Sequence, residues 1–511
     1  MQHLIIIGCL IIFCNLTVYP QLDIAVQLPL EPNSVAEQYA KTISEADLQN
    51  YLSILASDAL EGRETGSRGQ KMAAAFIREH FRDNRLRPIV IEGSDSLYLQ
   101  KFLLYRNFHK EIYIESNGHK YMHLKDLLYL GNANVSPPNE MSLHFVGDGE
   151  EKDYQGLDVV DGMVAFIAKT QNERQLKMKV ARENGAIAFF VLNTDHKSEF
   201  ENYLDKNARF FESTSITTQK EQPGKNILFL GSTELLAELL DVDLLKLKNA
   251  LKKARQTSKN PLRKIKSSSI NIKIEKISEQ FETENVLGFI EGSDKKEELV
   301  VITAHYDHVG KKGDQIFNGA DDDGSGTSAL MEMAQAFTIA KSNGHGPRRS
   351  LLFLTFTGEE KGLLGSDFYS KNPVWPLDKT VANLNIDMIG RVDPLHEDQD
   401  QYIYIIGSDR LSMDLHMINE QMNQLYTHME LDYKYNSPDD PNRFYYRSDH
   451  YNFARYNIPI IFYFNGTHAD YHQSTDTVEK IRFDLLKKRT DLIFHCTWEL
   501  ANREERIRMN Q

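Results

Sequence analysis

One stretch of the sequence, residues 299–327, places histidine and aspartate residues directly after an apolar run. The run 299–303 is rich in β-branched residues, which favours a buried strand, and it leads into His305 and Asp307. A polar loop then reaches residues 321–323, three aspartates flanked by glycines. Imidazole nitrogen and carboxylate oxygen are ligands that zinc accepts. The pattern predicts a metal site at the end of a strand.

Three further apolar runs also end in acidic or histidine residues. SLLFLTF precedes Glu359 and Glu360, VANLNI precedes Asp387, and IPIIFYF precedes a loop that contains His472. Ligands of open α/β sheets bind beyond the carboxyl ends of the strands, so we expect these side chains on one rim of the sheet. A two-metal hydrolytic site needs a bridging carboxylate and a base that is not a ligand. Five ligands and one base account for the set His305, Asp322, Glu360, Asp387, His472 and Glu359.

Composition narrows the class of protein. The chain has 511 residues, 41% of them hydrophobic and 26% charged, with a net charge of −14. This length favours two domains, or one domain with a large insertion. The negative charge argues against a nucleic-acid partner.

The amino terminus resembles a secretory signal. Residues 4–16 form an apolar stretch that is too short to span a bilayer, so we expect a signal peptide over 1–20 and export to the periplasm or the outside. A membrane anchor is the alternative if the segment is not cleaved. Two of the three cysteines, Cys9 and Cys14, fall in this segment. Cys496 is then a lone core thiol, and cysteine ligation of a metal is excluded.

Strands and helices alternate over much of the chain. Residues 43–117 contain two amphipathic helical patterns, from Ser44 and over 70–82. Residues 118–262 form a different, compact α/β pattern around one helix at 175–185. Residues 252–269 are rich in basic residues and contain no acid, so we expect a solvated connector, with a polyanion-binding patch as the alternative. The remainder, 270–505, predicts an α/β fold with a mixed, mostly parallel sheet sandwiched between helices, with strands at 270–277, 285–292, 299–304, 350–356, 381–389, 402–407 and 458–464 and helices at 327–341, 362–371, 411–426, 448–456 and 478–503.

Six motifs in order carry a specific resemblance. They are AHYDHVG, NGADDDGSG, TGEEKGLLGS, NIDMIGR, RSDHYNF and YHQSTDT. Together they resemble the co-catalytic di-zinc aminopeptidases of the leucine aminopeptidase and aminopeptidase Y type, within the superfamily of glutamate carboxypeptidase and transferrin receptor. ASDALEGRETGSRG is similar to the N-terminal segment of that family. Residues 118–262 resemble, more loosely, an inserted protease-associated domain.

The resemblance implies a role for each site residue. His305 and Asp387 match the ligands of one zinc, Glu360 and His472 those of the other, and Asp322 the bridge. Glu359 matches the general base. By spacing alone, Asp321 and Asp323 remain alternatives for the bridge. The remaining expectations are Asp307 as the residue that orients and polarises His305, and Tyr471 as a hydrogen-bond donor to the oxyanion or, alternatively, a packing residue.

Other polar residues near the motifs receive weaker interpretations. Asp449 and His450 are expected to support the ligands without binding the metal. Arg447 is expected to be solvated, although it is the one candidate partner for a substrate carboxylate. No role in the site is assigned to the remaining histidines considered, His308, His345, His396, His416, His428 and His468.

These observations lead to one hypothesis and its rivals. The hypothesis is a zinc exopeptidase with two Zn²⁺ ions that removes N-terminal residues from peptides, Glu359 taking a proton from water and passing it to the leaving amine. A glutaminyl cyclase would use one zinc, and a carboxypeptidase of the glutamate carboxypeptidase type would need a basic pocket. A non-catalytic relative would be expected to lack ligands that are present here.

Overall fold

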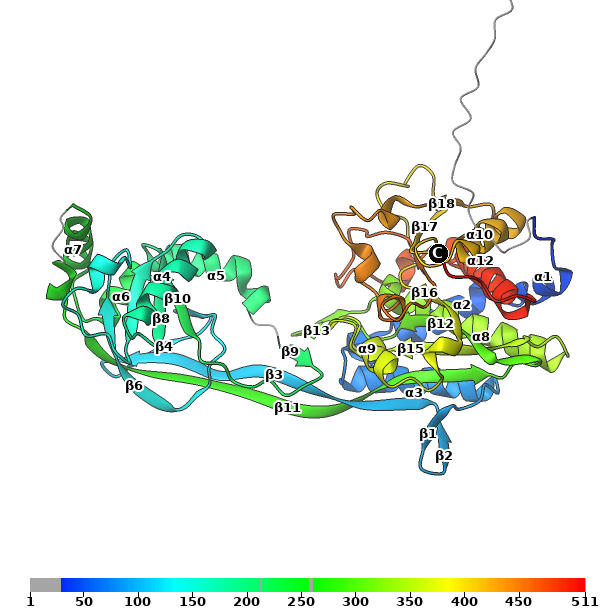
Figure 1. Cartoon of the computed structure of the whole chain (residues 1–511), viewed down its shortest axis with the longest axis horizontal. Helices are drawn as coiled ribbons and strands as arrows, with labels where there is room; N and C mark the ends of the chain where they lie inside the picture. Colours follow the sequence, from blue (N-terminus) through cyan, green and yellow to red (C-terminus); the bar gives the residue numbers. More distant parts are fainter. Residues whose placement is uncertain (1–28, 212–213, 257–260, 511) are drawn as a thin grey trace, which may run out of the picture. The chain divides into compact units, whose positions relative to one another are not determined.

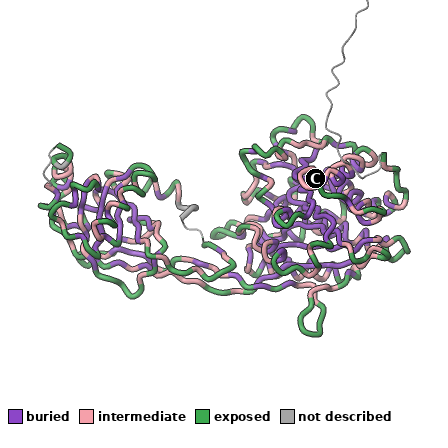
Figure 2. Tube along the Cα trace, viewed as in Figure 1, coloured by how far each residue is buried: buried purple, intermediate pink, exposed green. Residues whose placement is uncertain are grey.

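The computed structural model describes residues 29–211, 214–256 and 261–510. It divides into two compact units. The first contains the described residues up to Phe102 and from Glu282 onward, and the second is Leu103–Phe281. In each unit the strands form the buried interior (Figure 2). The predicted signal peptide lies outside the described residues and stays a prediction.

A mixed sheet forms the centre of the first unit (Figure 1). Its strand order is β18-β17-β19-β16-β12-β15-β11. The neighbours β19/β16, β16/β12 and β12/β15 are parallel, whereas β17/β19 and β15/β11 are antiparallel. This confirms the predicted α/β fold with a mostly parallel sheet, with strands at Ser268–Ile290 (β11), Lys295–His305 (β12), Arg349–Phe356 (β15), Thr380–Ile386 (β16), Tyr402–Ile406 (β17), Glu430–Asp432 (β18) and Ile460–Phe464 (β19).

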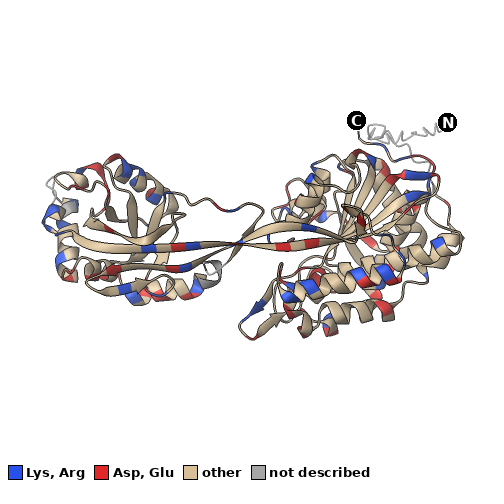
Figure 3. Cartoon of the chain, turned by 90° about the horizontal axis from the view of Figure 1, so that it is seen from below, with Lys and Arg blue, Asp and Glu red and all other residues tan. Residues whose placement is uncertain are grey.

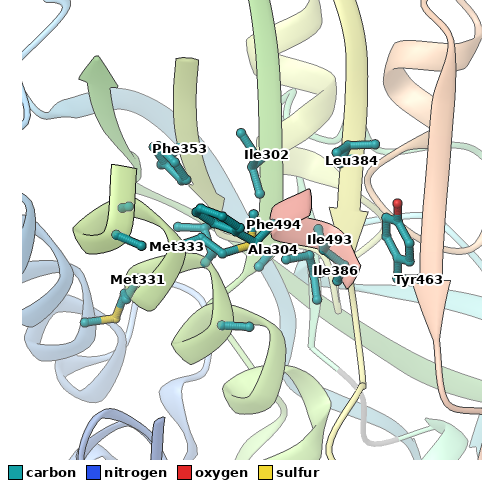
Figure 4. Close-up of a cluster of buried hydrophobic side chains, with 14 of the residues drawn as sticks. Ile302, Ala304, Met331, Met333, Phe353, Leu384, Ile386, Tyr463, Ile493 and Phe494 are labelled. Carbon is teal, nitrogen blue, oxygen red and sulfur yellow. The ribbon is translucent and has the colours of Figure 1, made fainter. Parts of the chain in front are cut away.

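Helices cover both faces of this sheet. Successive residues of β12 point to opposite sides, so the strand contributes apolar side chains to the core on each face. Ile302 and Ala304 pack with side chains of α8 and α12, among them Met333 and Phe494 (Figure 4). Leu299 joins the cluster on the other face, which contains residues of α9 and α11. The helices are α1 (Ser34–Ala40), α2 (Glu45–Leu55), α3 (Arg68–Asp83), α8 (Gly326–Ser342), α9 (Leu364–Lys371), α10 (Met413–Met422), α11 (Tyr451–Ala454) and α12 (Phe483–Asn502).

In the second unit, β6, β7, β8 and β10 are parallel neighbours. Two hydrophobic clusters fill its interior, one on each face of these strands. The elements are β3 (Leu99–Ser116), β4 (His119–Met122), β5 (Leu128–Tyr129), β6 (Val135–Phe145), β7 (Met163–Ile167), α4 (Gln171–Glu183), β8 (Ala188–Thr194), α5 (Lys197–Phe211), β9 (Ser215–Thr217), β10 (Ile227–Ser232), α6 (Thr233–Leu239) and α7 (Leu244–Gln256).

Three local expectations differ from the structure. The strands expected at 270–277 and 285–292 are one continuous strand, β11, because it pairs with β6 at one end and with β15 at the other. The expected connector at 252–269 begins inside α7, whose apolar residues pack into the core of the second unit. The helix expected at 448–456 is shorter in the structure, where α11 comprises only Tyr451–Ala454.

Acidic and basic residues are interspersed along the helices of both units (Figure 3). Among the described residues, none of the helices has the length and apolar character needed to cross a membrane.

Candidate metal centre

The predicted site residues follow four adjacent parallel strands. His305 is the last residue of β12, Glu359 and Glu360 follow β15, Asp387 follows β16, and the loop with His472 follows β19. Because these strands run in the same direction, their carboxyl ends meet at one edge of the sheet. The structure therefore brings the side chains together from segments more than 160 residues apart.

The carboxylate of Asp322 lies between two histidines. Its Oδ1 is 3.2 Å from His305 Nε2, and its Oδ2 is 3.0 Å from His472 Nε2. Asp387 Oδ1 lies 3.5 Å from the same nitrogen of His305, and Glu360 Oε2 lies 3.2 Å from that of His472. The five residues thus form two groups of nitrogen and oxygen atoms that share Asp322, as expected for a bridging carboxylate.

The two neighbouring aspartates, Asp321 and Asp323, accept hydrogen bonds from main-chain N–H groups instead. The carboxylate of Asp323 accepts hydrogen bonds from the N–H groups of His305, Gly326 and Met388, at 2.8–3.1 Å. Asp321 accepts from Gly390 N–H at 2.7 Å. These contacts fix the loop around Asp322, and among the three acids they leave Asp322 facing both imidazoles.

The loop after β19 is fixed by charged contacts. Asp470 lies 2.9 Å from Arg391 Nη2 and 2.6 Å from Lys480 Nζ. Asp476, which is fully buried, accepts hydrogen bonds from the N–H groups of Asp321 and Asp322. His472 between them has a φ of +54°, in the left-handed region that is uncommon for residues other than glycine. The loop conformation therefore aims His472 at Asp322.

The two consecutive glutamates face different surroundings. Glu360 contacts imidazoles, whereas Glu359 lines a small cleft together with His305, Asp322 and Asp387. Glu359 Oε2 is 3.9 Å from His305 Nε2, farther than either predicted ligand oxygen. This geometry is compatible with a base at position 359 and a ligand at 360.

Asp307 supports the site differently from the expectation. His305 Nδ1 lies 3.1 Å from the main-chain carbonyl oxygen of Asp307, whereas the Asp307 carboxylate is 3.8 Å away. That carboxylate accepts hydrogen bonds from Thr65 Oγ1 and from Glu359 N–H, at 2.7 and 3.2 Å. The main-chain carbonyl group of Asp307 therefore orients the imidazole. The Asp307 side chain joins Thr65, near the N-terminus, to the loop after β15 that contains Glu359.

Arg63 is a supporting residue that the sequence did not single out. Its side chain is fully buried and donates to the carbonyl oxygens of Tyr306, Asn318 and Gly319, at 2.8, 2.6 and 2.9 Å. A further hydrogen bond reaches Leu55. The motif that resembles the family's N-terminal segment contained this residue, but nothing in the sequence showed which loops it would join.

His308 was assigned no role from the sequence, yet it lies in the site. It is fully buried, and its Nδ1 is 2.8 Å from Glu360 Oε1. Asp449 is also fully buried and accepts a hydrogen bond from Ser366, so it does not reach the five predicted ligands by any hydrogen bond that the described residues show. The ring of Tyr471 stacks on that of His472 at 3.9 Å between centroids and lines the cleft.

The electrostatics of the site suit a divalent cation. Burial alone would raise the pKa of Asp322, but the imidazoles of His308, His305 and His472 hold it well below its usual value. Burial would lower the pKa of His472, whereas Asp322 and Glu360 raise it to about 10. Burial, reinforced by Asp387 and Glu360, raises the pKa of Glu359 well above its usual value. The carboxylates thus supply negative charge at the position where imidazole nitrogens converge.

The donor set fits zinc. It consists of imidazole nitrogen and carboxylate oxygen, which zinc accepts, and the one cysteine among the described residues, Cys496, lies buried in α12. His472 Nε2 and Glu360 Oε1 are buried atoms without a hydrogen-bond partner among the described residues. Atoms of this kind are unfavourable unless a partner or an ion satisfies them.

Comparisons with known proteins agree with this site. Residues 285–497 match the family model described as Peptidase family M28. Aminopeptidase YwaD of Bacillus subtilis is 34% identical over 110 residues, which cover 21% of this chain and 22% of that protein. A probable leucine aminopeptidase of Arthroderma otae is 26% identical over 245 residues, which cover 46% of this chain and 62% of that protein. In both cases the match spans less than two thirds of the related protein.

Two solved structures share the fold. An aminopeptidase from Aneurinibacillus sp. strain AM-1 matches with a TM-score of 0.54 and 18% identity, covering 92% of this chain and 97% of that chain. BSAP, a zinc aminopeptidase from Bacillus subtilis, matches with a TM-score of 0.50 and 19% identity, covering 91% and 98%. The protease-associated nature of the insert stays a prediction. The family match agrees with the predicted resemblance: residues 285–497, which hold all the predicted ligands, are the part of the chain that matches Peptidase family M28.

Proposed function

We propose that this protein is a zinc-dependent aminopeptidase that uses two Zn²⁺ ions to remove N-terminal residues from peptides. The observation that carries the proposal is the position of Asp322, whose two carboxylate oxygens face His305 and His472 separately. His305, Asp387 and Asp322 would hold one ion, and His472, Glu360 and Asp322 the other. Zinc bound there would polarise the scissile carbonyl group and lower the pKa of water.

Glu359 is proposed as the general base. It lines the cleft, it is not among the closest contacts of either histidine, and the hydrogen bond from its N–H to Asp307 fixes its backbone. Its carboxylate would accept a proton from the attacking water and donate it to the leaving amine. The phenol of Tyr471 stays protonated because burial and nearby carboxylates raise its pKa, so it can donate a hydrogen bond to the developing oxyanion.

The cleft indicates the substrate class. Part of its wall is apolar and is formed by Met388, Phe444, Phe462 and Phe464, which belong to one hydrophobic cluster. An apolar wall of this kind binds an apolar side chain by removing its surface from water. We therefore propose peptides with a free N-terminus and an apolar first residue as substrates.

The rival functions make different demands on the same cleft. A glutaminyl cyclase would need one zinc, whereas the ligands here form two groups around Asp322. A carboxypeptidase would need a basic pocket, and the basic residue of this cleft is Arg447, which is solvent-exposed and lies over the Phe444 ring. Export remains part of the proposal, since it depends on the signal peptide predicted at 1–20.

The test combines metal content with turnover. We expect two zinc ions per chain by mass spectrometry, and hydrolysis of leucyl and phenylalanyl nitroanilides that a chelator abolishes. An N-acetylated substrate should not be cleaved. Glu359→Gln should lower kcat by at least 100-fold with both ions retained, whereas the control Glu291→Gln, at an exposed ion pair with Arg87, should not change kcat. One zinc per chain with cyclisation of Gln-peptides, or release of a C-terminal glutamate, would favour a rival.

A further inference from the structure

His308 is a buried imidazole next to the second group of ligands that the five-ligand assignment leaves without a role. Its side chain has no exposed surface, and its ring lies edge-on to the ring of His472 at 5.6 Å between centroids. Its main-chain N–H donates to the carbonyl oxygen of Arg63 at 3.2 Å. The ring also lies against Gly319, where a Cβ atom would come within 2.5 Å of it. Backbone on two sides therefore confines this imidazole.

The ring nitrogen of His308 that faces the site has one near partner. Nδ1 lies 2.8 Å from Glu360 Oε1 and 3.7 Å from Asp322 Oδ2. Neither His308 Nδ1 nor Glu360 Oε1 has a hydrogen-bond partner among the described residues, and the 2.8 Å approach is the shortest polar contact that the structure shows for either atom. The second oxygen of Glu360 faces His472 at 3.2 Å. The two oxygens of Glu360 are thus divided between two histidines.

Distances separate ligands from supporting residues. Two zinc ligands at about 2.0–2.1 Å and a tetrahedral angle lie roughly 3.3 Å apart. The pairs within the proposed ligand groups measure 3.0–3.5 Å, which fits a shared ion. His308 Nδ1 lies 2.8 Å from Glu360 Oε1 but 3.7 Å from Asp322 Oδ2, the shared oxygen that His472 Nε2 approaches to 3.0 Å. His308 therefore lies against Glu360 and farther from the carboxylate that the two ligand groups share.

We propose that His308 is a positioning residue for the second metal site. It holds Oε1 of Glu360, so that Glu360 presents Oε2 alone to the ion. This inference rests on the proposed two-zinc site. Supporting residues that orient a metal ligand typically change metal affinity by roughly 10–100-fold when removed. The effect should be confined to the site of Glu360 and His472, because His305 and Asp387 make no contact with His308 that the described residues show.

The experiment measures zinc binding by the intact protein. His308→Leu removes the donor, whereas His308→Asn keeps an N–H donor near the position of Nδ1. The matched control is His396→Leu, because His396 Nδ1 also lies 2.8 Å from a carboxylate, that of Asp393, which is not a predicted ligand. Each variant is titrated with zinc in a metal buffer, its zinc content is measured by mass spectrometry, and its folding is checked by thermal unfolding.

We expect His308→Leu to bind one ion with wild-type affinity and the other roughly 10–100-fold more weakly. His308→Asn should bind both ions within about threefold of the wild type, as should His396→Leu, because a donor is kept in one and the site is untouched in the other. In a His472→Ala background, which already lacks a ligand of the second ion, His308→Leu should have no further effect on the remaining ion.

Three results would overturn the inference. Unchanged affinity for both ions in His308→Leu would show that Glu360 needs no such partner. Equal weakening of both ions would indicate a general structural role. Loss of the second ion in His308→Asn as well would show that the imidazole is a ligand itself. A wild-type protein that binds fewer than two zinc ions would instead refute the proposed function, so the two failures are distinguishable.

Discussion

Replacing Arg63 by methionine would remove a buried charge from beneath the metal-site loops. The guanidinium is fully buried and donates to the carbonyl oxygens of Leu55, Tyr306, Asn318 and Gly319. These hydrogen bonds join the segment that contains Arg63 to the residue after β12 and to the start of the aspartate loop, which is the loop that contains residues 321–323. The methionine side chain fills much of the same space but offers no donor.

The expected loss of stability follows from those acceptors. Gly319 O retains a second partner, the N–H of Gly324 at 3.3 Å, so three of the four carbonyl groups lose this donor without a second hydrogen bond that the structure shows. A buried polar group left without a partner costs about 1–3 kcal/mol. Three such groups predict a loss of at least about 3 kcal/mol, a large part of the 5–15 kcal/mol typical of a folded domain. The melting temperature should fall by roughly 10 °C.

Urea denaturation followed by circular dichroism measures this loss. Arg63→Lys should lie between the wild type and Arg63→Met, because one ammonium group cannot reach all the carbonyl oxygens. The control is Arg87→Met, since Arg87 is mostly exposed and forms one ion pair with Glu291. It should lose less than about 1 kcal/mol. A free energy of unfolding for Arg63→Met within about 1 kcal/mol of the wild type would refute the reasoning.

Three further outcomes are expected. Asp323→Ala removes the acceptor for three backbone N–H groups, including that of His305, and should cost at least about 3 kcal/mol in urea denaturation, so an unchanged midpoint would contradict this role. Burial raises the pKa of Glu332 from 4.5 to about 7, so its contribution to stability is complete below pH 4.5 and is lost as the pH rises to 7. Glu332→Gln should remove up to about 3 kcal/mol of that pH dependence and unfold later than the wild type at pH 8, whereas parallel pH profiles would exclude this carboxyl group as the cause. Tyr471→Phe should lower kcat by roughly 10–100-fold with zinc content unchanged, and an unaltered kcat would assign Tyr471 to packing.

The sequence was sufficient to predict the fold class and the edge of the sheet at which the candidate site forms. Apolar runs of strand length end in acidic or histidine residues, and parallel strands place such ends together whatever the loops do. His305, Glu360 and Asp387 needed no further information, because each stands within a few residues of a strand end. The resemblance to a family then separated Asp322 from its neighbours, which spacing alone did not.

Contacts between distant segments were decided by the tertiary structure alone. Arg63 and Thr65 lie more than 240 residues before the loops that they support. Asp476 likewise bonds the backbone of the aspartate loop from a distant part of the chain. A sequence pattern shows the hydrophobic period of a single helix or strand. The partners of these hydrogen bonds depend instead on how separate elements pack together. The same reason explains the continuous strand β11, whose pairing with β6 and β15 overrides the break expected from its polar middle.

His308 illustrates the difference between what the sequence predicts and what only the structure shows. In the sequence it is one more histidine, three residues after the predicted ligand His305, and its type and spacing do not separate it from a core residue. In the structure it reaches Glu360, which follows a different strand, because β12 and β15 are parallel neighbours in register. The sequence by itself predicted which residues could bind metal. Only the packing of the strand ends placed His308 beside Glu360, because that contact depends on a distance of 2.8 Å between two loops.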